Sequence, residues 1–166
     1  MEAIYISGCV NSFVEIMIIA RVLLEEQGIK FLHNEDFAYQ VNSQQVNIIG
    51  VGSPDLGYDD LDRAVQDVDL NEGYNIILSH TYEIIGDAQD YDEIDLVLAG
   101  DTHGGQMNIP FITENLLGRF YQIEYLSGKY VLDNLILYVN RGLGTIGLPW
   151  RFNCRPEVTL IEIEGK

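Results

Sequence analysis

The stretch "LVLAGDTHGGQ", residues 96–106, contains the pattern that decides the fold. Four apolar residues typical of a buried strand are followed, after Gly100, by Asp101, His103 and two further glycines. An earlier apolar run, "NIILSH", ends in a similar way on His80. Proteins that contain both helices and sheets place their functional sites at the carboxyl ends of strands. The two runs therefore predict neighbouring buried strands that bring His80, Asp101 and His103 to one edge of a sheet.

The residue types that follow the second run point to metal and phosphate chemistry. Side chains two residues apart in an extended segment point the same way, so Asp101 and His103 are expected to face a metal ion together with His80. Gly104 and Gly105 would allow a phosphate group to approach the backbone, and Gln106 could donate to a phosphate oxygen. A purely structural role for each of these residues is the alternative.

The rest of the chain predicts an α+β fold in a single domain, with two sheets packed face to face and helices outside. His33 has no partner in view, and we interpret it as a surface or turn histidine. Helices are expected at 12–27, capped by Ser12 and stopped by Gly28, and at 59–68. Strands are expected at 3–7, 29–34, 74–80, 91–100 and 157–165, in a hairpin over 37–52, and in antiparallel strands over 120–142 with a turn at Ser127-Gly128.

Composition limits the classes of partner. The chain has 166 residues, with 26 acidic against 9 basic side chains and a net charge of −17. Such a surface repels nucleic acid and anionic membranes, so a phosphate ligand would need bound cations to reverse the local charge. No leader pattern and no apolar run long enough for a transmembrane segment is seen, so a cytoplasmic location is expected, with peripheral membrane contact left open. Cys9 and Cys154 are expected to be free thiols.

Three blocks in order, "NIILSH", "DLVLAGDTHGGQ" and "LYVNRGLGTIGLPWRFNCRPEVTLIEI", resemble the C-terminal half of the calcineurin-like metallophosphoesterases, in the bacterial phosphodiesterase branch. The resemblance implies a two-sheet β sandwich flanked by helices, with a two-metal site that hydrolyses phosphoesters. The family takes its ligands from Asp-x-His, Gly-Asp, Gly-Asn-His-Asp, a lone His and Gly-His-x-His. The implied cofactor is a divalent metal, namely Mn, Fe, Mg or Zn, although the chain could also bind none.

Residue by residue, the family motifs are only partly present. His80 matches the lone His, His103 matches the second His of Gly-His-x-His, and Asp101 stands at the first. "GCVN", residues 8–11, stands at Gly-Asn-His-Asp, so Cys9 is a weak ligand at best. Val10 stands at the position of the catalytic His, which leaves no catalytic residue. Neither of the first two motifs precedes residue 8, so we expect residues 1–166 to form a family domain without its N-terminal part.

The resemblance leaves two functions open. One is a phosphoesterase whose catalysis is lost or strongly reduced in this isolated chain. The other is a non-catalytic binding or scaffold domain, and a longer or split gene is a further alternative. In either case a homodimer or a partner chain is expected to cover the face left by the missing half. Arg141 and Arg151 are candidate contacts to a phosphoester, with pairing to the many acidic residues as the alternative.

Overall fold

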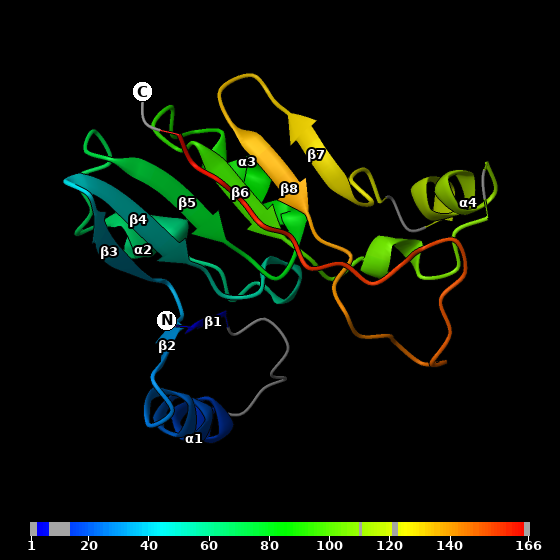
Figure 1. The fold of residues 1–166 in the computed structure, drawn as a ribbon, viewed down its shortest axis with the longest axis horizontal. Helices are drawn as coiled ribbons and strands as arrows, with labels where there is room; N and C mark the ends of the chain where they lie inside the picture. Colours follow the sequence, from blue (N-terminus) through cyan, green and yellow to red (C-terminus); the bar gives the residue numbers. More distant parts are fainter. Residues whose placement is uncertain (1–2, 7–13, 110, 121–122, 165–166) are drawn as a thin grey trace.

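The core of the molecule is a six-stranded sheet. The computed structural model describes residues 3–6, 14–109, 111–120 and 123–164. The strand order in the large sheet is β3-β4-β5-β6-β8-β7 (Figure 1). These strands are β3 Glu35–Val41, β4 Gln44–Gly50, β5 Tyr74–Leu78, β6 Leu96–Ala99, β7 Gly128–Val131 and β8 Ile136–Val139. The fold is mixed α/β, with a six-stranded sheet flanked by few helices, which is consistent with the expected two-sheet fold lacking its N-terminal part.

The four central strands, β4, β5, β6 and β8, run parallel to one another, while β3 and β7 pair antiparallel at the two edges. In β5 and β6, Ile76 lies opposite Leu96 and Ile77 opposite Val97. All four of these side chains are buried. Parallel strands covered on both faces are apolar without interruption, which is why "NIIL" and "LVLA" could be recognised as strands from the sequence.

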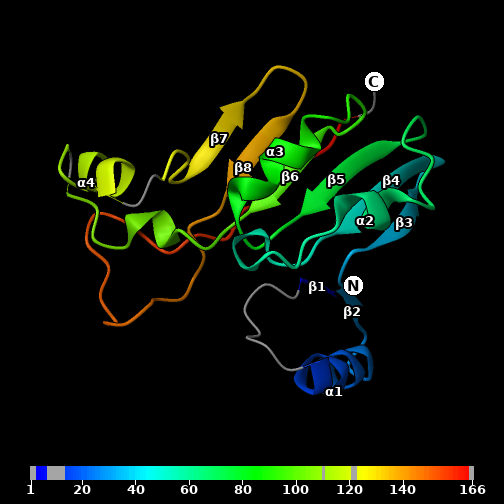
Figure 2. The same ribbon diagram turned by 180° about the vertical axis from the view of Figure 1, so that it is seen from behind.

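The main core lies between the sheet and two short helices, α2 Leu61–Val65 and α3 Ile85–Ala88, which lie on one face (Figure 2). The opposite face, here called the second face, is crossed in front of β6 and β8 by the C-terminal segment, residues 157–164 (Figure 1). The fully buried side chains of the main core include Ile49, Val51, Ile77, Ile84, Ile94, Val97, Leu137 and Val139.

A smaller unit contains the N-terminal part of the chain. Strand β1, Ala3–Ile6, pairs in parallel with β2, Ile29–Leu32, and helix α1, Val14–Glu25, connects them. Gly28 has a φ of 75° and its N–H donates to Glu25 O at 2.9 Å, as expected for the residue that stops a helix. The predicted cap Ser12 lies outside the described residues. Arg21 ties the helix to β3 through a 2.9 Å ion pair with Glu35.

Helix α4, Thr113–Phe120, and three short 3-10 segments complete the described chain. The 3-10 segments are η1 Pro54–Leu56, η2 Tyr82–Ile84 and η3 His103–Gly105. None of the helices in the described ranges is long and apolar enough to cross a membrane.

Two local predictions are wrong. The turn between β7 and β8 lies at 132–135, where Leu132 N donates to Leu135 O at 2.9 Å, and Ser127-Gly128 instead leads into β7. Asp133 and Asn134 favour a turn as strongly as Ser-Gly does, because their short polar side chains bond to nearby backbone. Residues 157–164 alternate like a strand but form none, because no neighbouring strand in the described ranges pairs with them.

Candidate functional site

Polar residues gather where the parallel strands end. Asp55 follows β4, His80 follows β5 and Asp101 follows β6, while Asn140 and Arg141 follow β8. Because the four strands are parallel, these residues share the carboxyl edge of the sheet. The structure therefore brings His80 and Asp101, two of the three expected ligands, to one place.

His80 and Asp101 form an ion pair at this edge. His80 Nε2 lies 3.1 Å from Asp101 Oδ1, and the two side chains are 22% and 52% exposed. The hydrogen bond with Asp101 raises the pKa of His80, although partial burial opposes the shift. The same bond lowers the pKa of Asp101. Each partner thus favours the ionised form of the other, so a proton competes with any cation for the His80 ring.

The segment after Asp101 is a tight turn, and the expectation of an extended segment is wrong. Asp101 has a φ of 66° and His103 a φ of 51°. The backbone turns here because the chain enters η3 directly. The ring of His103 is directed to the loop after β8, where Nδ1 lies 3.3 Å from Gly144 O. A positive charge on His103 contributes to the lowered pKa of Asp101. The two side chains do not bind each other, however, because Asp101 pairs with His80 and His103 lies against Gly144 O.

Gly104 packs against protein atoms in the position where we expected a phosphate group. A Cβ at this position would lie 2.5 Å from Arg141 Cγ and 2.7 Å from Cys154 Sγ. Cys154 is a buried free thiol, as predicted, and its Sγ donates to His103 O at 3.1 Å. Gly105, with a φ of 72°, continues the turn. The glycines therefore permit close packing of the turn onto the chain that follows β8.

Gln106 uses its amide to hold the loop after β8. Its Nε2 donates to Ile146 O at 3.0 Å and to Leu148 O at 2.9 Å, and its Oε1 accepts from Ile146 N at 2.7 Å. These bonds occupy both ends of the side chain, so a phosphate oxygen would have to displace the loop to reach it.

The two arginines are also bound to protein groups. Arg151 donates to His103 O at 3.1 Å and to Arg141 O at 2.8 Å. Arg141 pairs with Glu157 at 2.5 Å between Nε and Oε2, which is the acidic pairing weighed as the alternative. Arg151 thus fastens the loop after β8 to the turn that carries His103, while Arg141 ties the end of β8 to the C-terminal segment. Cys9 and Val10 lie outside the described residues.

Sequence reasoning missed Asp55. The charges of Asp55 and of Glu83 in η2 both contribute to the raised pKa of His80. A signal exists, because "NIIG" is another apolar run followed by a polar loop, but its hairpin pattern alone does not place Asp55 beside His80. His33 lies in the bend before β3, as a turn histidine, but it is partly buried rather than on the surface. Burial lowers its pKa.

The opposite shifts of the two histidines give a pH prediction. In metal-free protein, NMR titration of the ring protons is expected to place the pKa of His80 above, and that of His33 below, the ordinary value of about 6.5. Asp101→Asn should lower the pKa of His80 and leave His33 unchanged. An unchanged His80 in this variant would contradict the pairing.

The two histidines also affect stability in opposite directions. His80 contributes stability that is complete below its unfolded pKa and is lost as pH rises through its folded pKa. His33, whose folded pKa is lowered, makes the fold less stable as pH falls from its unfolded pKa toward its folded pKa. Urea unfolding across this pH range, compared between the wild type and each His→Gln variant, separates the two contributions.

Comparison with known proteins places the chain in a family. It is 34% identical over 155 residues to a metallophosphoesterase of Aquifex aeolicus, covering 86% of this chain and 54% of that protein. It is 31% identical over 142 residues to the metallophosphoesterase YkoQ of Bacillus subtilis, covering 85% and 52%. The corresponding values for the phosphodiesterase YaeI of Escherichia coli are 31% over 147 residues, 84% and 49%. The chain belongs to the metallophosphoesterase family.

The coverage limits what the relatives say about this chain. It spans about half the length of the curated relatives it matches. No family model and no solved structure match it. The names of these relatives imply that the family uses divalent metal. Within the described ranges, however, no group of three or more His, Cys, Asp or Glu side chains is arranged to hold an ion. The donors of the described chain therefore do not fit a two-metal centre.

Proposed function

We propose that this chain is a metallophosphoesterase domain whose own catalysis of phosphoester hydrolysis is lost or strongly reduced. The observation that supports the proposal is the His80–Asp101 pair, in which two expected metal ligands bind each other at 3.1 Å. Two-metal hydrolysis needs ligands for both ions and a group that handles protons at the reacting centre. At the described carboxyl edge His80 and Asp101 bind each other, His103 is directed to Gly144 O, and Asp55 completes no group of three ligands with them.

We also propose that His80 and Asp101 at this edge bind a single divalent cation weakly. Imidazole nitrogen and carboxylate oxygen are ligands that Mn, Fe, Zn and, through oxygen, Mg accept in proteins. The net charge of −17 favours any cation at this edge. Because the pKa of His80 is raised, binding should strengthen as pH rises and the ring loses its proton.

Metal content and hydrolysis test the proposal together. Protein purified without chelator and dialysed against Mn²⁺ is expected to retain less than about one equivalent, since a single His–Asp pair binds weakly. Hydrolysis of bis(p-nitrophenyl) phosphate should stay near that of the His80→Asn/Asp101→Asn variant, with His33→Asn as the matched control. About two equivalents of bound metal, with hydrolysis that the double variant abolishes, would overturn the proposal.

A non-catalytic binding or scaffold domain is the second candidate. It is supported by the loop after β8, which Gln106 and Arg151 hold in place while large apolar side chains face solvent. Those side chains are Leu143, Ile146, Leu148 and Trp150. A rigid exposed apolar loop suits contact with a second copy or a partner chain. A metal-free and inactive result in the experiment above would favour this candidate.

A further inference from the structure

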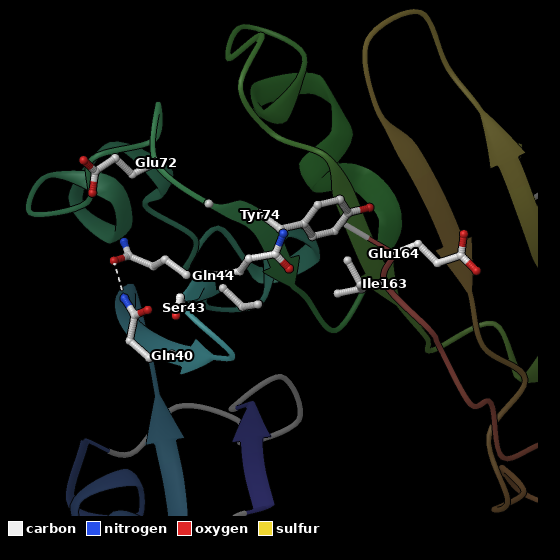
Figure 3. Close-up of a pocket in the computed structure, with 10 residues that line it drawn as sticks. Gln40, Ser43, Gln44, Glu72, Tyr74, Ile163 and Glu164 are labelled. Atoms are coloured by element: carbon white, nitrogen blue, oxygen red, sulfur yellow. Dashed lines mark hydrogen bonds between the residues drawn. The ribbon is translucent and has the colours of Figure 1, made fainter. Parts of the chain in front are cut away.

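The second face of the sheet has an open groove at the edge opposite the candidate site. Its volume is about 460 Å³, and it lies between the β3–β4 hairpin and the C-terminal segment (Figure 3). Val46 of β4 and Tyr74 of β5 line it from the sheet, and Ile163 lines it from the C-terminal segment. The remaining lining residues are Gln40, Ser43, Gln44, Gln45, Glu72, Gly73 and Glu164. The groove therefore combines apolar walls with several side-chain amides.

The wall made by the C-terminal segment is already shaped like a strand. Glu157 and Thr159 face the sheet, where Arg141 Nε donates to Glu157 at 2.5 Å and Asn140 Nδ2 donates to Thr159 Oγ1 at 2.8 Å. The alternating residues Val158 and Leu160 point away and are 81% and 85% exposed. The segment is thus anchored at its start and presents apolar side chains at a spacing of two, as a strand does.

The backbone of this segment is unpaired. Glu157 N donates to Gly142 O at 3.0 Å, but residues 158–164 make no backbone–backbone hydrogen bond within the described chain. An extended segment with free N–H and C=O groups is a template for pairing with another strand. Strand addition obtains its affinity from these main-chain bonds, and its specificity from pockets for alternate side chains. Here the groove supplies such a pocket beside the free backbone.

The acidic residues around the groove indicate what kind of polypeptide could bind there. Glu72 and Glu164 line the groove, Glu162 lies on the same segment, and no lysine or arginine of the described chain is among the lining residues. Like charges that face each other across paired strands are destabilising. A second copy of this segment would bring its own Glu162 and Glu164 against the first, within a chain of net charge −17. The groove instead suits a strand with lysine or arginine at alternate positions.

We propose that the groove and the C-terminal segment bind an extended segment of another polypeptide, with alternating apolar and basic residues, by strand addition. The apolar residues of the partner would face Val46, Tyr74 and Ile163, and its backbone would pair with residues 158–164. The basic residues would lie near Glu72 and Glu164, and Gln44 would bond to a free backbone group at the groove's end, since Gln40 and Gln45 already bond to each other. This surface lies away from the carboxyl edge, so its test does not depend on the chemistry proposed there.

A short labelled peptide of alternating valine and lysine is the probe. Fluorescence anisotropy should show saturable binding, and residues 158–164 should gain protection from amide hydrogen exchange when the peptide is bound. Leu160→Pro removes one backbone donor at an exposed position and should weaken binding by about tenfold. Leu160→Ala keeps the N–H and should bind more tightly than the proline variant.

Two further controls separate strand pairing from simple charge attraction. The same peptide with every amide N-methylated keeps its charge but has no backbone N–H to donate on either edge, and it should not bind. Glu164→Lys should weaken binding more than Asp90→Lys, which makes the same change in net charge at an exposed residue after α3 on the other face. Equal binding of the N-methylated peptide, or equal effects of the two charge reversals, would overturn the proposal. So would a dimer in which residues 158–164 are already protected without peptide.

Discussion

Gly104→Ala is expected to lower the free energy of unfolding by about 3 kcal/mol. A left-handed backbone costs an alanine about 1–2 kcal/mol, and overpacking in a filled site adds about 1–3 kcal/mol. Both apply, because Gly104 has a φ of 60° and a new Cβ would lie 2.7 Å from the buried Cys154 Sγ. Arg141, which lies as close, is tied to Glu157 and cannot simply rotate away.

Gly57→Ala is the matched control. Gly57 has a φ of 68°, but a Cβ added there would meet no other atom of the described chain within 4 Å. It should cost only the backbone contribution, about 1–2 kcal/mol, in the same urea unfolding measurement. If the two variants lose equal stability, the turn at 103–105 is not packed against Cys154 as described, and space for a ligand beside Gly104 would have to be reconsidered.

The contrast between these glycines shows what the sequence could and could not predict. The strands that end at His80 and Asp101 were predictable, because buried parallel strands are continuous apolar runs that stop abruptly. The hydrogen-bond partners of the residues that follow these strands were not predictable. Gln106 bonds to Ile146, 40 residues later, and Arg151 bonds to His103, 48 residues earlier. Such pairs depend on which strands become neighbours, and local patterns do not carry that information.

A similar limit applies to the pairing of strands. The hairpin of β3 and β4 was predicted correctly, because its turn and its alternation are both local. That β4 also pairs in parallel with β5 was not visible, so Asp55 was not placed beside His80. The C-terminal segment shows the converse, since its alternation is that of a strand but its partner is not in the described chain. Alternation of apolar and polar residues indicates that a segment can form a strand, whereas the presence of a neighbouring strand decides whether it does.

Asn34→Ala is expected to destabilise the fold by about 3–5 kcal/mol and to disturb the candidate site. Asn34 is 6% exposed. Its Oδ1 accepts from Gly52 N at 2.7 Å and from Asp60 N at 3.1 Å, and its Nδ2 donates to Tyr58 O at 2.9 Å. Each buried group left without a partner costs about 1–3 kcal/mol. The residue also has a φ of 54°, which asparagine tolerates better than alanine does.

These bonds hold the loop that places Asp55 near His80, so the loss should be visible at the site as well as in urea unfolding. Asn34→Asp keeps the acceptor for both N–H groups and loses only the donor to Tyr58 O, so its stability should fall between the wild type and the alanine variant. In folded Asn34→Ala protein the pKa of His80 should fall, because Asp55 no longer holds its place and part of the raising charge is removed. A variant of full stability, or one with an unchanged His80 titration, would show that the loop keeps its shape without Asn34.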